Sequence, residues 1–585
     1  EGGKIEWGYY ETNNPVLVTA NDIAEPGESR MSPSMRELSL EQVLEPMEKA
    51  MALVPLLGEL GYEDRRSFNG LLSVTADGGS LIGEAPEISG LWFAEAVWVK
   101  DGPGVGKVVA DWMTKGSPEY DPYGIDIARF YPEQKQDDYV FGRCGEIAKK
   151  VYTPAVHPRE PFETGRQLFK SPFYEREVAL GGYFMEAAGW ERAHGYAANE
   201  PTLLVKYRGQ IPQRMNEWDS RHFWEVSNAE QLALSDDVGM VNLSHFAIYD
   251  IDDQSAEPLL EYLAVAKVGG ATQVGKGVYT HFLDEKGGIR ADLTIVRLSE
   301  DCFRVICGGG TGHRDLVWIK QMAAARHADI EIHNRTHQLA TLGLWGPNAR
   351  KVLASLVDDP NTVSDAKFPF ATAANIEIAG IKIWAFRISY VGELGWELYF
   401  DFADGLQLWD LFADAGVNPV GIETYANSRR LEKSLRLQNA DLETDYNLHE
   451  ADLARKLVKK ADFHGKAAYV AQKAADQQAS YLCTMVMLKN VDASGVARYP
   501  VGEWPILNKE TREVLLDELG RRSICTSVEY GPSLGSNIIL GYIPAEFASV
   551  GTELLLEYFC EEYPIRIEAV GYAPLLDPEN LRVRS

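Results

Sequence analysis

The chain has 585 residues, of which 45% are hydrophobic and 24% charged, and its formal net charge is −29. This length exceeds what a single hydrophobic core supports, so we expect about two to four globular domains. The acidic surface disfavours binding to nucleic acid, and no apolar run reaches the ~20 residues that span a bilayer, so we predict neither nucleic-acid nor membrane partners.

The six cysteines are scattered and none forms a CxxC pair. This spacing argues against a zinc site and a dense disulfide framework, and it favours a reducing compartment, either the cytoplasm or, in a eukaryote, the mitochondrial matrix. The 11 histidines do not cluster at metal-ligand spacing, and the sequence has no P-loop or HExxH motif. We therefore predict no metal site and no hydrolase or nucleotide-triphosphatase chemistry.

The first 135 residues mix short strand-like runs with one amphipathic segment. Apolar residues recur at three- to four-residue spacing over residues 40–60, which predicts a helix. Residues 71–75 and 81–82 flank an Asp-Gly-Gly sequence, which predicts a strand, a turn and a second strand.

A glycine-rich turn follows the apolar run at residues 91–99. It contains Gly102, Gly104 and Gly106, and a helix is predicted from Lys107 onward. Glycine lets a ligand approach the backbone, and a helix N-terminus offers free N–H groups, so the pattern suits a flat or anionic ligand. The same pattern also occurs in turns that bind nothing.

The remaining chain changes character twice. Residues 136–175 are polar and contain four prolines, which is typical of a surface linker. Helices and strands are interleaved over residues 176–475, and short strands separated by Gly, Asn and Asp follow over residues 476–585. We predict an α+β multidomain protein with a small β-rich domain at its C-terminal end.

Two turns bear carboxylates. Asp292 follows a Gly-Gly pair and begins a strand predicted at residues 293–296, whereas Tyr390 and Glu397 lie on a double-glycine turn between two predicted strands. A pterin ring has a donor edge that a carboxylate can bind and flat faces that an aromatic side chain can cover. Residue types alone leave the structural interpretation open, because acidic residues are also common where a strand begins.

Residues 390–397, Tyr-Val-Gly-Glu-Leu-Gly-Trp-Glu, resemble the Tyr-Thr-Gly-Glu-x-Gly-x-Glu signature of the glycine-cleavage T-protein family. Further segments match that family in the expected order along residues 176–575. They are residues 241–244, the Gly-Gly turn ending at Asp292, and residues 344–347, 430–433, 462–466, 526–527 and 540–542.

Other segments narrow the resemblance to one branch. Residues 189–192 (Gly-Trp-Glu-Arg), 81–86 and 123–130 are similar to dimethylglycine and sarcosine dehydrogenases rather than to stand-alone T-proteins. Residues 426–428, Ala-Asn-Ser, replace an Arg-Asp-Ser of the T-proteins, which removes one arginine contact to folate. The dinucleotide-binding βαβ unit that opens the flavoenzyme half of these relatives is not in the sequence, so we expect another polypeptide to supply it or the chain to have been cut.

The resemblance implies a domain order. Residues 1–135 would be the C-terminal part of an FAD-dependent oxidoreductase domain, residues 176–475 a T-protein-like folate-binding domain, and residues 476–585 a C-terminal β-barrel domain. The implied activity is oxidation of a CH–NH donor. A small methylated amine such as dimethylglycine or sarcosine would lose an N-methyl group to FAD chemistry, and tetrahydrofolate would accept the one-carbon unit.

The resemblance also implies residue roles. Asp292 would act on the folate amine nitrogens, and Tyr390 and Glu397 would hold the pterin ring. Gly102, Gly104 and Gly106 would lie beside the FAD ring, and Tyr10 would be a catalytic tyrosine of the flavin half. For Tyr10 the alternative is a core position in a strand that spans residues 7–11.

Two other functions stay open. The T-protein fold also serves tetrahydrofolate-dependent methyltransferases or demethylases that use no flavin, and a related chain could be a non-catalytic regulatory subunit. The flavin-oxidase-like segment disfavours the first alternative, and the retained Asp292, Tyr390 and Glu397 disfavour the second.

Overall fold

The computed structural model describes residues 5–10, 15–19, 23, 34–63, 66–151, 156–222, 224–270 and 272–584. They form two compact units. Unit 1 comprises the described residues up to Val109 together with Gly124–Ile127 and Pro132–Arg166; unit 2 comprises Ala110–Tyr123, Ala128–Tyr131 and the chain from Gln167 onward. No helix in the described ranges has the length and apolar character needed to cross a bilayer.

Unit 1 is built from short elements. Helices α1 (Leu40–Leu53) and α2 (Leu56–Leu60) lie near a two-stranded sheet of β1 (Met35–Glu37) and β2 (Phe68–Gly70). A second small sheet pairs β3 (Leu81–Glu84) with β4 (Trp92–Glu95), and α4 (Asp137–Lys150) is the last helix of the unit. The helix predicted over residues 40–60 is present but interrupted after Leu53, because Pro55 cannot donate a helical hydrogen bond and the chain restarts there as α2.

Three other local predictions in this part of the chain are wrong. Residues 71–75 form no strand, and the strand at Leu81 pairs with residues 92–95 instead. Residues 7–10 form no strand, and Glu11 lies outside the described residues. The segment predicted as a linker contains α4, whose Arg143 and Glu146 are buried.

Helix α3 begins at Gly102 and ends at Lys115, so Gly102, Gly104 and Gly106 lie in its first turns rather than in a turn before it. Intrinsic preference disfavours three glycines in a helix, but Val105, Val109 and Trp112 recur on one side and give it a half-buried face. The apolar spacing therefore outweighs the glycine signal that predicted a turn.

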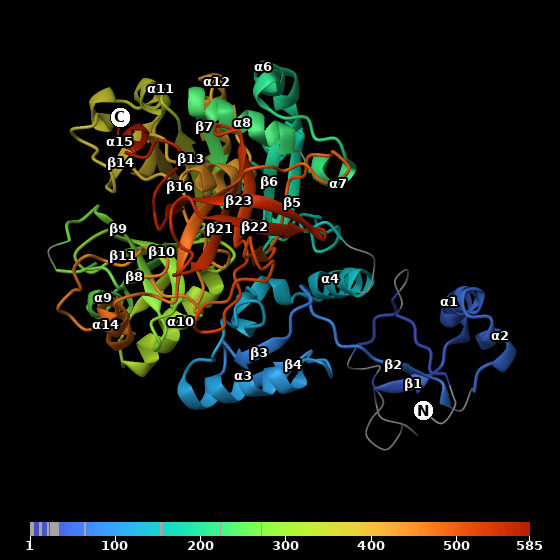
Figure 1. Ribbon diagram of the computed structural model, residues 1–585. Helices are drawn as coiled ribbons and strands as arrows, with labels where there is room; N and C mark the ends of the chain where they lie inside the picture. The colour runs from blue at the N-terminus through green and yellow to red at the C-terminus, as the bar shows by residue number, and fades with distance from the viewer. Residues whose placement is uncertain are drawn as a thin grey trace. The chain divides into compact units, whose positions relative to one another are not determined.

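Unit 2 contains three large sheets, which are mostly antiparallel, and helices pack on the first two of them (Figure 1). The first is five-stranded, in the order β12 (Glu331–Asn334), β8 (Ala247–Asp252), β11 (Phe303–Cys307), β10 (Ile289–Arg297) and β9 (Gly277–Leu283). Helices α9 (Ala256–Leu263) and α10 (Gly312–Ala325) bury leucine and isoleucine side chains against it.

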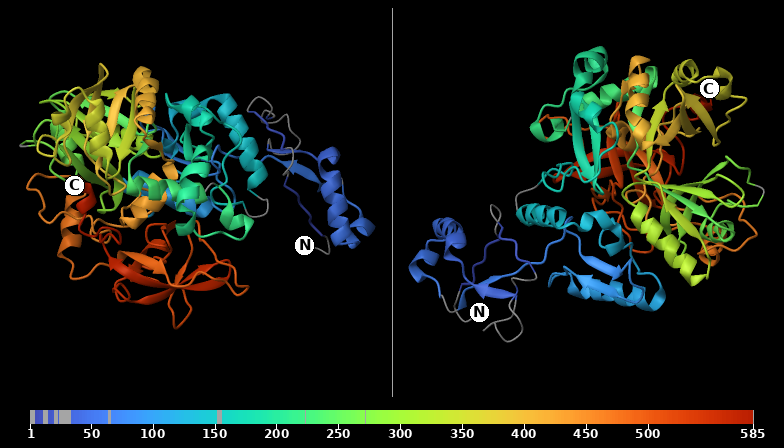
Figure 2. Two further views of the ribbon diagram at one scale, coloured as in Figure 1. Left: turned by 90° about the horizontal axis from the view of Figure 1, so that it is seen from above. Right: turned by 180° about the vertical axis from the view of Figure 1, so that it is seen from behind.

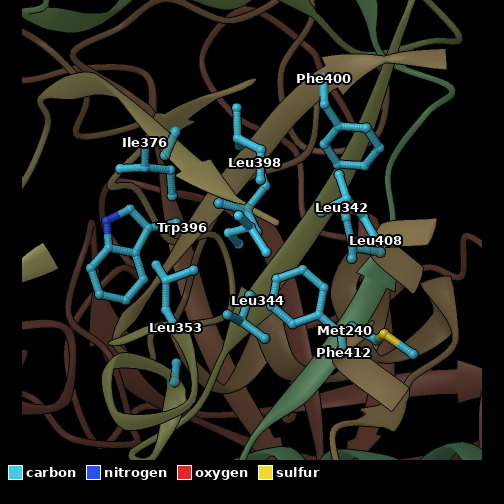
Figure 3. Close-up of a cluster of buried hydrophobic side chains, with 14 of the residues drawn as sticks. Met240, Leu342, Leu344, Leu353, Ile376, Trp396, Leu398, Phe400, Leu408 and Phe412 are labelled. Atoms are coloured by element: carbon cyan, nitrogen blue, oxygen red, sulfur yellow. The ribbon is translucent and has the colours of Figure 1, made fainter. Parts of the chain in front are cut away.

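The second sheet is six-stranded. Its order is β14 (Ala373–Ile378), β15 (Ile381–Phe386), β16 (Gly395–Asp401), β13 (Leu339–Trp345), β7 (Gly239–Asn242) and β17 (Asn418–Pro419). Figure 3 shows its core, where Leu342, Leu398 and Phe400 from the strands meet Leu408 and Phe412 of α12 (Gly405–Asp414) and Leu353 of α11 (Ala349–Leu356). Figure 3 also shows Trp396 and Ile376 at one side of this cluster.

The C-terminal sheet, red in Figure 2, forms a separate layer of unit 2. Its order is β19 (Ile506–Leu507), β22 (Glu553–Tyr558), β23 (Glu561–Val570), β18 (Ser480–Met487), β21 (Ser536–Pro544) and β20 (Ser527–Gly531). The predicted α+β class with a β-rich C-terminal domain is confirmed.

Candidate functional site

Strands β9 and β10 bring three polar side chains to one face of the five-stranded sheet. Their register places Asp292 directly opposite His281. Tyr279 lies two residues before His281 and shares its face, because side chains alternate along a strand. The sequence analysis placed Asp292 where a strand begins, but β10 already starts at Ile289, so Asp292 lies within the strand, where it pairs with His281 of β9.

The Gly-Gly turn sets this register. Asp284 accepts hydrogen bonds from the backbone N–H of Lys286 (2.9 Å) and of Gly288 (2.8 Å). Gly287 has φ +80°, and a Cβ atom at Gly288 would lie 2.1 Å from the carbonyl oxygen of Thr444. Both glycines are therefore required, the first for its backbone conformation and the second for a close approach.

Asp292 is deep in the fold but keeps part of its surface accessible. Burial raises its pKa to about 7, and nearby Asp315 adds to this increase, whereas a hydrogen bond with Tyr279 opposes it. A carboxyl group with this pKa is divided between its charged and neutral forms near neutral pH. It can therefore accept or deliver a proton there.

The turn before β16 supplies the second group of residues. Gly392 adopts φ +70°, and a Cβ atom there would lie 2.5 Å from the Lys433 side chain. The Tyr390 hydroxyl donates a hydrogen bond to the carbonyl oxygen of Arg436 at 2.5 Å. In β16 itself the Tyr399 hydroxyl donates to Glu397 at 2.5 Å, and burial raises the pKa of Glu397 to about 7.

Tyr425 connects the two groups. Its ring lies 5.2 Å from that of Tyr390 and stacks at 5.5 Å on Trp345. The charges of both Asp292 and Glu397 act on its hydroxyl, and together with burial they raise the pKa of Tyr425. Asp292, Tyr390 and Glu397 are therefore brought together around one aromatic side chain.

Two buried polar atoms beside this cluster have no hydrogen-bond partner among the described residues. They are Nε of Arg436 and Oε1 of Gln438. Arg436 is the residue whose carbonyl receives Tyr390, and the amide of Gln438 donates to the carbonyl of Arg290, two residues before Asp292, at 3.3 Å. Unsatisfied buried polar groups of this kind indicate a place for a polar ligand or water.

The sequence analysis missed Tyr279, His281, Tyr425 and Arg436. The first two leave a signal, since Tyr-Thr-His places two polar rings on one face of an apolar strand. Tyr425 and Arg436 leave none, because tertiary contacts alone bring them to the site.

The residues predicted for the flavin half lie elsewhere. Tyr10 is 51% exposed in an irregular segment of unit 1. Gly102, Gly104 and Gly106 lie in the unit 1 part of α3, and a Cβ atom at any of them would meet nothing within 4 Å. The described residues of unit 1 thus do not form an enclosure that fits a flavin around these positions.

Comparison with family models assigns three segments. Residues 173–461 match the GCVT N-terminal domain, residues 502–570 the glycine cleavage T-protein C-terminal barrel domain, and residues 115–171 the FAD dependent oxidoreductase central domain.

Individual proteins with similar sequences point to the same family. Dimethylglycine dehydrogenase of Rattus norvegicus is 29% identical over 99% of this chain and 64% of its own. 4-Methylaminobutanoate oxidase (formaldehyde-forming) of Paenarthrobacter nicotinovorans is 31% identical over 67% of this chain and 46% of its own length. Sarcosine dehydrogenase of Mus musculus is 26% identical over 83% of this chain and 55% of its own length. The chain spans about three-fifths of the length of the dimethylglycine dehydrogenases that it matches.

The glycine cleavage system aminomethyltransferase T from Bartonella henselae has a similar fold. The structural match covers 70% of this chain and 98% of the aminomethyltransferase chain, with a TM-score of 0.55 and 21% sequence identity.

Proposed function

Since this chain belongs to the dimethylglycine and sarcosine dehydrogenase family, with T-protein-type domains in unit 2, we propose that unit 2 binds tetrahydrofolate and loads it with a one-carbon unit. The one-carbon unit would come from the N-methyl group of a small methylated amine. One observation carries this proposal. Two carboxyl groups, Asp292 and Glu397, each have a pKa near 7 and face a shared set of tyrosine rings.

The side chains of this cluster match the flat faces and the hydrogen-bonding edge of a pterin ring. Tyr390 and Tyr425 would cover a flat ring, because aromatic faces pack well on heterocycles. Glu397 would accept hydrogen bonds from the N–H groups on the ring edge, and it is already oriented by Tyr399. The unpartnered Nε of Arg436 and Oε1 of Gln438 provide a donor and an acceptor for the remaining polar atoms.

Asp292 would manage the proton of the reaction. When an amine nitrogen of tetrahydrofolate bonds to the one-carbon unit, the nitrogen must give up a proton. Asp292 in its charged form can take it, and the pKa near 7 allows the proton to be released afterward. Tyr279, through its hydrogen bond, would keep the carboxylate directed toward the nitrogen.

Oxidation of the methylated amine is flavin chemistry in this proposal. FAD would remove the hydride that turns the N-methyl group into a transferable unit. The described residues of unit 1 do not enclose a flavin, so no step is assigned to Tyr10, Gly102, Gly104 or Gly106, and their roles stay predictions. A second polypeptide that supplies the nucleotide-binding unit also stays a prediction.

That open environment favours a second candidate function. A tetrahydrofolate-dependent demethylase that needs no flavin would use Asp292, Tyr390 and Glu397 in the same way. The two candidates predict different absorbance spectra of the native protein. Flavin bands support the dehydrogenase function, and a colourless protein that binds tetrahydrofolate supports the demethylase function.

Titration calorimetry with tetrahydrofolate tests the shared part of both candidates. We expect saturable binding by the unaltered chain and binding at least about tenfold weaker in Asp292→Asn, since a charge-assisted hydrogen bond contributes roughly 1.5–3 kcal/mol. A chain that shows flavin bands but no binding of tetrahydrofolate would contradict the proposal.

A further inference from the structure

The chain that follows β23 lies along the residues at the end of α13 (Arg429–Glu432). The backbone N–H of Leu576 donates a hydrogen bond to the carbonyl oxygen of Glu432 at 3.0 Å. The ammonium group of Lys433 donates to the carbonyl oxygens of Leu576 and Asp577, each at 3.0 Å. These bonds hold the C-terminal segment, residues 571–584, against the chain at Glu432 and Lys433.

Asp577 anchors the short helix α15 (Leu581–Arg584) at the end of this segment. Its carboxylate accepts hydrogen bonds from the backbone N–H of Leu581 at 3.0 Å and of Arg582 at 3.2 Å. The same carboxylate lies 3.3 Å from the ammonium group of Lys433, which is almost fully buried. Because one carboxylate binds both α15 and Lys433, the backbone of Arg582 has a defined position.

The side chain of Arg582 reaches the turn before β16. Its Nε atom lies 2.8 Å and 3.0 Å from the two carboxylate oxygens of Glu393, and a terminal nitrogen donates to the carbonyl oxygen of Ser235 in α8 (Trp224–Asp236). Glu393 is fully buried and also pairs with Arg429. Arg429 is fully buried, whereas the Arg582 side chain is 38% exposed, so Arg582 can be replaced without removing a side chain from the core.

Glu393 lies between the two residues that this turn presents to the candidate site. Two residues separate it from Tyr390, and three separate it from Glu397. The backbone N–H of Glu393 donates to the Ser389 hydroxyl oxygen at 3.1 Å, so its main chain is held as well as its side chain. With so few residues between them, the position of Glu393 sets the positions of Tyr390 and Glu397.

The C-terminal segment also contacts the second anchor of Tyr390. The guanidinium group of Arg436 lies over the ring of Tyr572, 5.4 Å from its centroid. The carbonyl oxygen of Arg436 is the acceptor of the Tyr390 hydroxyl. Residues 571–584 therefore support Tyr390 at its backbone, through Glu393, and at its hydroxyl, through Arg436.

We propose that Arg582 is a positioning residue of the candidate site: by binding Glu393 it holds the turn before β16, so that Tyr390 and Glu397 face one ligand. The identity of that ligand as tetrahydrofolate rests on the proposed function. The effect of Arg582 on the turn requires no ligand, so it can be measured on the ligand-free full-length chain.

Hydrogen exchange followed by mass spectrometry tests the effect on the turn. We expect the amides of residues 391–394 to exchange about 5- to 50-fold faster in Arg582→Ala, because the turn loses a charged partner, whereas the amides of β21 keep their rates. Arg582→Lys retains the positive charge and should return the rates to within about threefold of the unaltered chain. Arg584→Ala is the matched control, since Arg584 is exposed in the same helix, and it should change nothing.

Unchanged exchange at residues 391–394 in a folded Arg582→Ala protein would overturn the inference. Equal acceleration in β21 would also overturn it, because it would show a general loss of stability. If Arg582→Ala does not fold, Arg582→Gln, which keeps an N–H donor but no charge, replaces it under the same criteria.

Calorimetry with tetrahydrofolate gives the second measurement. We expect binding about 3- to 10-fold weaker in Arg582→Ala and unaltered binding in Arg584→Ala, because only the first variant loosens the turn. Normal affinity in an Arg582→Ala protein whose turn exchanges faster would refute the positioning role. If the unaltered chain does not bind tetrahydrofolate, the proposed function fails, and the exchange rates alone decide the role of Arg582.

Discussion

Asp292 and Glu397 are largely buried carboxyl groups, and no cationic side chain among the described residues contributes to their pKa values. Burial is the largest cause of both raised pKa values, and the groups that oppose it are neutral tyrosine hydroxyls. An arginine or lysine at hydrogen-bond distance would have favoured the charged form and removed the near-neutral titration. The site therefore has two proton acceptors with similar affinity and different neighbours.

The first prediction concerns the pH dependence of stability. Asp292 has a folded pKa of about 7, above its value in an unfolded chain, so the folded state binds the proton more tightly. Its stabilising contribution is complete below about pH 4 and is lost as pH rises toward 7, to a total of about 2–4 kcal/mol. Asp292→Asn should reduce this slope by the contribution of Asp292, while Glu397 and Glu177 keep theirs, and urea unfolding between pH 4 and pH 8 would measure the difference. An unchanged slope in the variant would assign the titration to other groups.

The second prediction separates Glu397 from another buried carboxyl group. Glu397→Gln should weaken tetrahydrofolate binding by about 10- to 100-fold, since Gln presents one acceptor and no charge to the ring edge. Glu177 is a matched control, because it is also buried, accepts a hydrogen bond from Tyr196 at 2.8 Å and has a pKa raised to about 7. Calorimetry should show near-normal affinity in Glu177→Gln, and equal losses in both variants would indicate a structural effect.

Much of the residue-scale site could be predicted from sequence, and the reason is local. Asp292, Tyr390 and Glu397 each lie on a short glycine-containing turn or an adjoining strand whose residue types are unusual. Tyr425 and Arg436 belong to a segment that becomes part of the site only after the two sheets pack. No spacing along the chain encodes that contact.

At the scale of elements, buried ion pairs hold the turn before β16 in place. Glu393 in that turn is fully buried and pairs with Arg429 of α13 (Arg429–Glu432) and with Arg582 of α15 (Leu581–Arg584), the latter at 2.8 Å. Arg429 also binds Glu432 at 2.8 Å. The turn that presents Tyr390 and Glu397 is therefore attached both to a neighbouring helix and to the C-terminal helix.

The third prediction is that Arg429→Met destabilises the protein by about 3–5 kcal/mol, because Glu393 and Glu432 would remain buried with a cation removed. The midpoint of urea unfolding measures this loss. Arg176→Ala is the control, since its pair with Asp410 is about half exposed and its loss should leave the unfolding midpoint nearly unchanged. A small effect in Arg429→Met would show that Arg582 alone compensates Glu393.

The interleaved helices and strands of unit 2 were predicted as a class, although β10 begins at Ile289 and not at residue 293, whereas the elements of unit 1 were predicted poorly. The strands of unit 2 carry long apolar runs that exclude other structures, as in β13 and β21. Unit 1 has short strands, a proline within α1 and three glycines within α3, so local preferences and the observed structure disagree. Tertiary packing decides such segments, and the sequence pattern does not contain it.

At the scale of the whole molecule, the net charge of −29 affects how an anionic ligand arrives. Tetrahydrofolate carries carboxylates on its glutamate tail, so long-range repulsion should slow its approach. Salt screens this repulsion over a distance of roughly 10 Å at 0.1 M. The fourth prediction is that the association rate constant rises about two- to fivefold between about 0.02 M and 0.2 M salt, as stopped-flow fluorescence would record. A rate that falls with salt would reveal a local positive field at the site entrance.

The order of strands in unit 2 also has a consequence for folding. Strands β7 and β13 are hydrogen-bonded neighbours, with Asn242 opposite Leu342, although the whole five-stranded sheet lies between them in sequence. During synthesis this sheet is complete once β12 has left the ribosome, before β16 and β17 exist. Its folding brings the ends of β7 and β13 close together and so reduces the loop-closure entropy of the six-stranded sheet. Mutations that slow the assembly of β8–β12 should therefore delay the folding of strands that they do not touch.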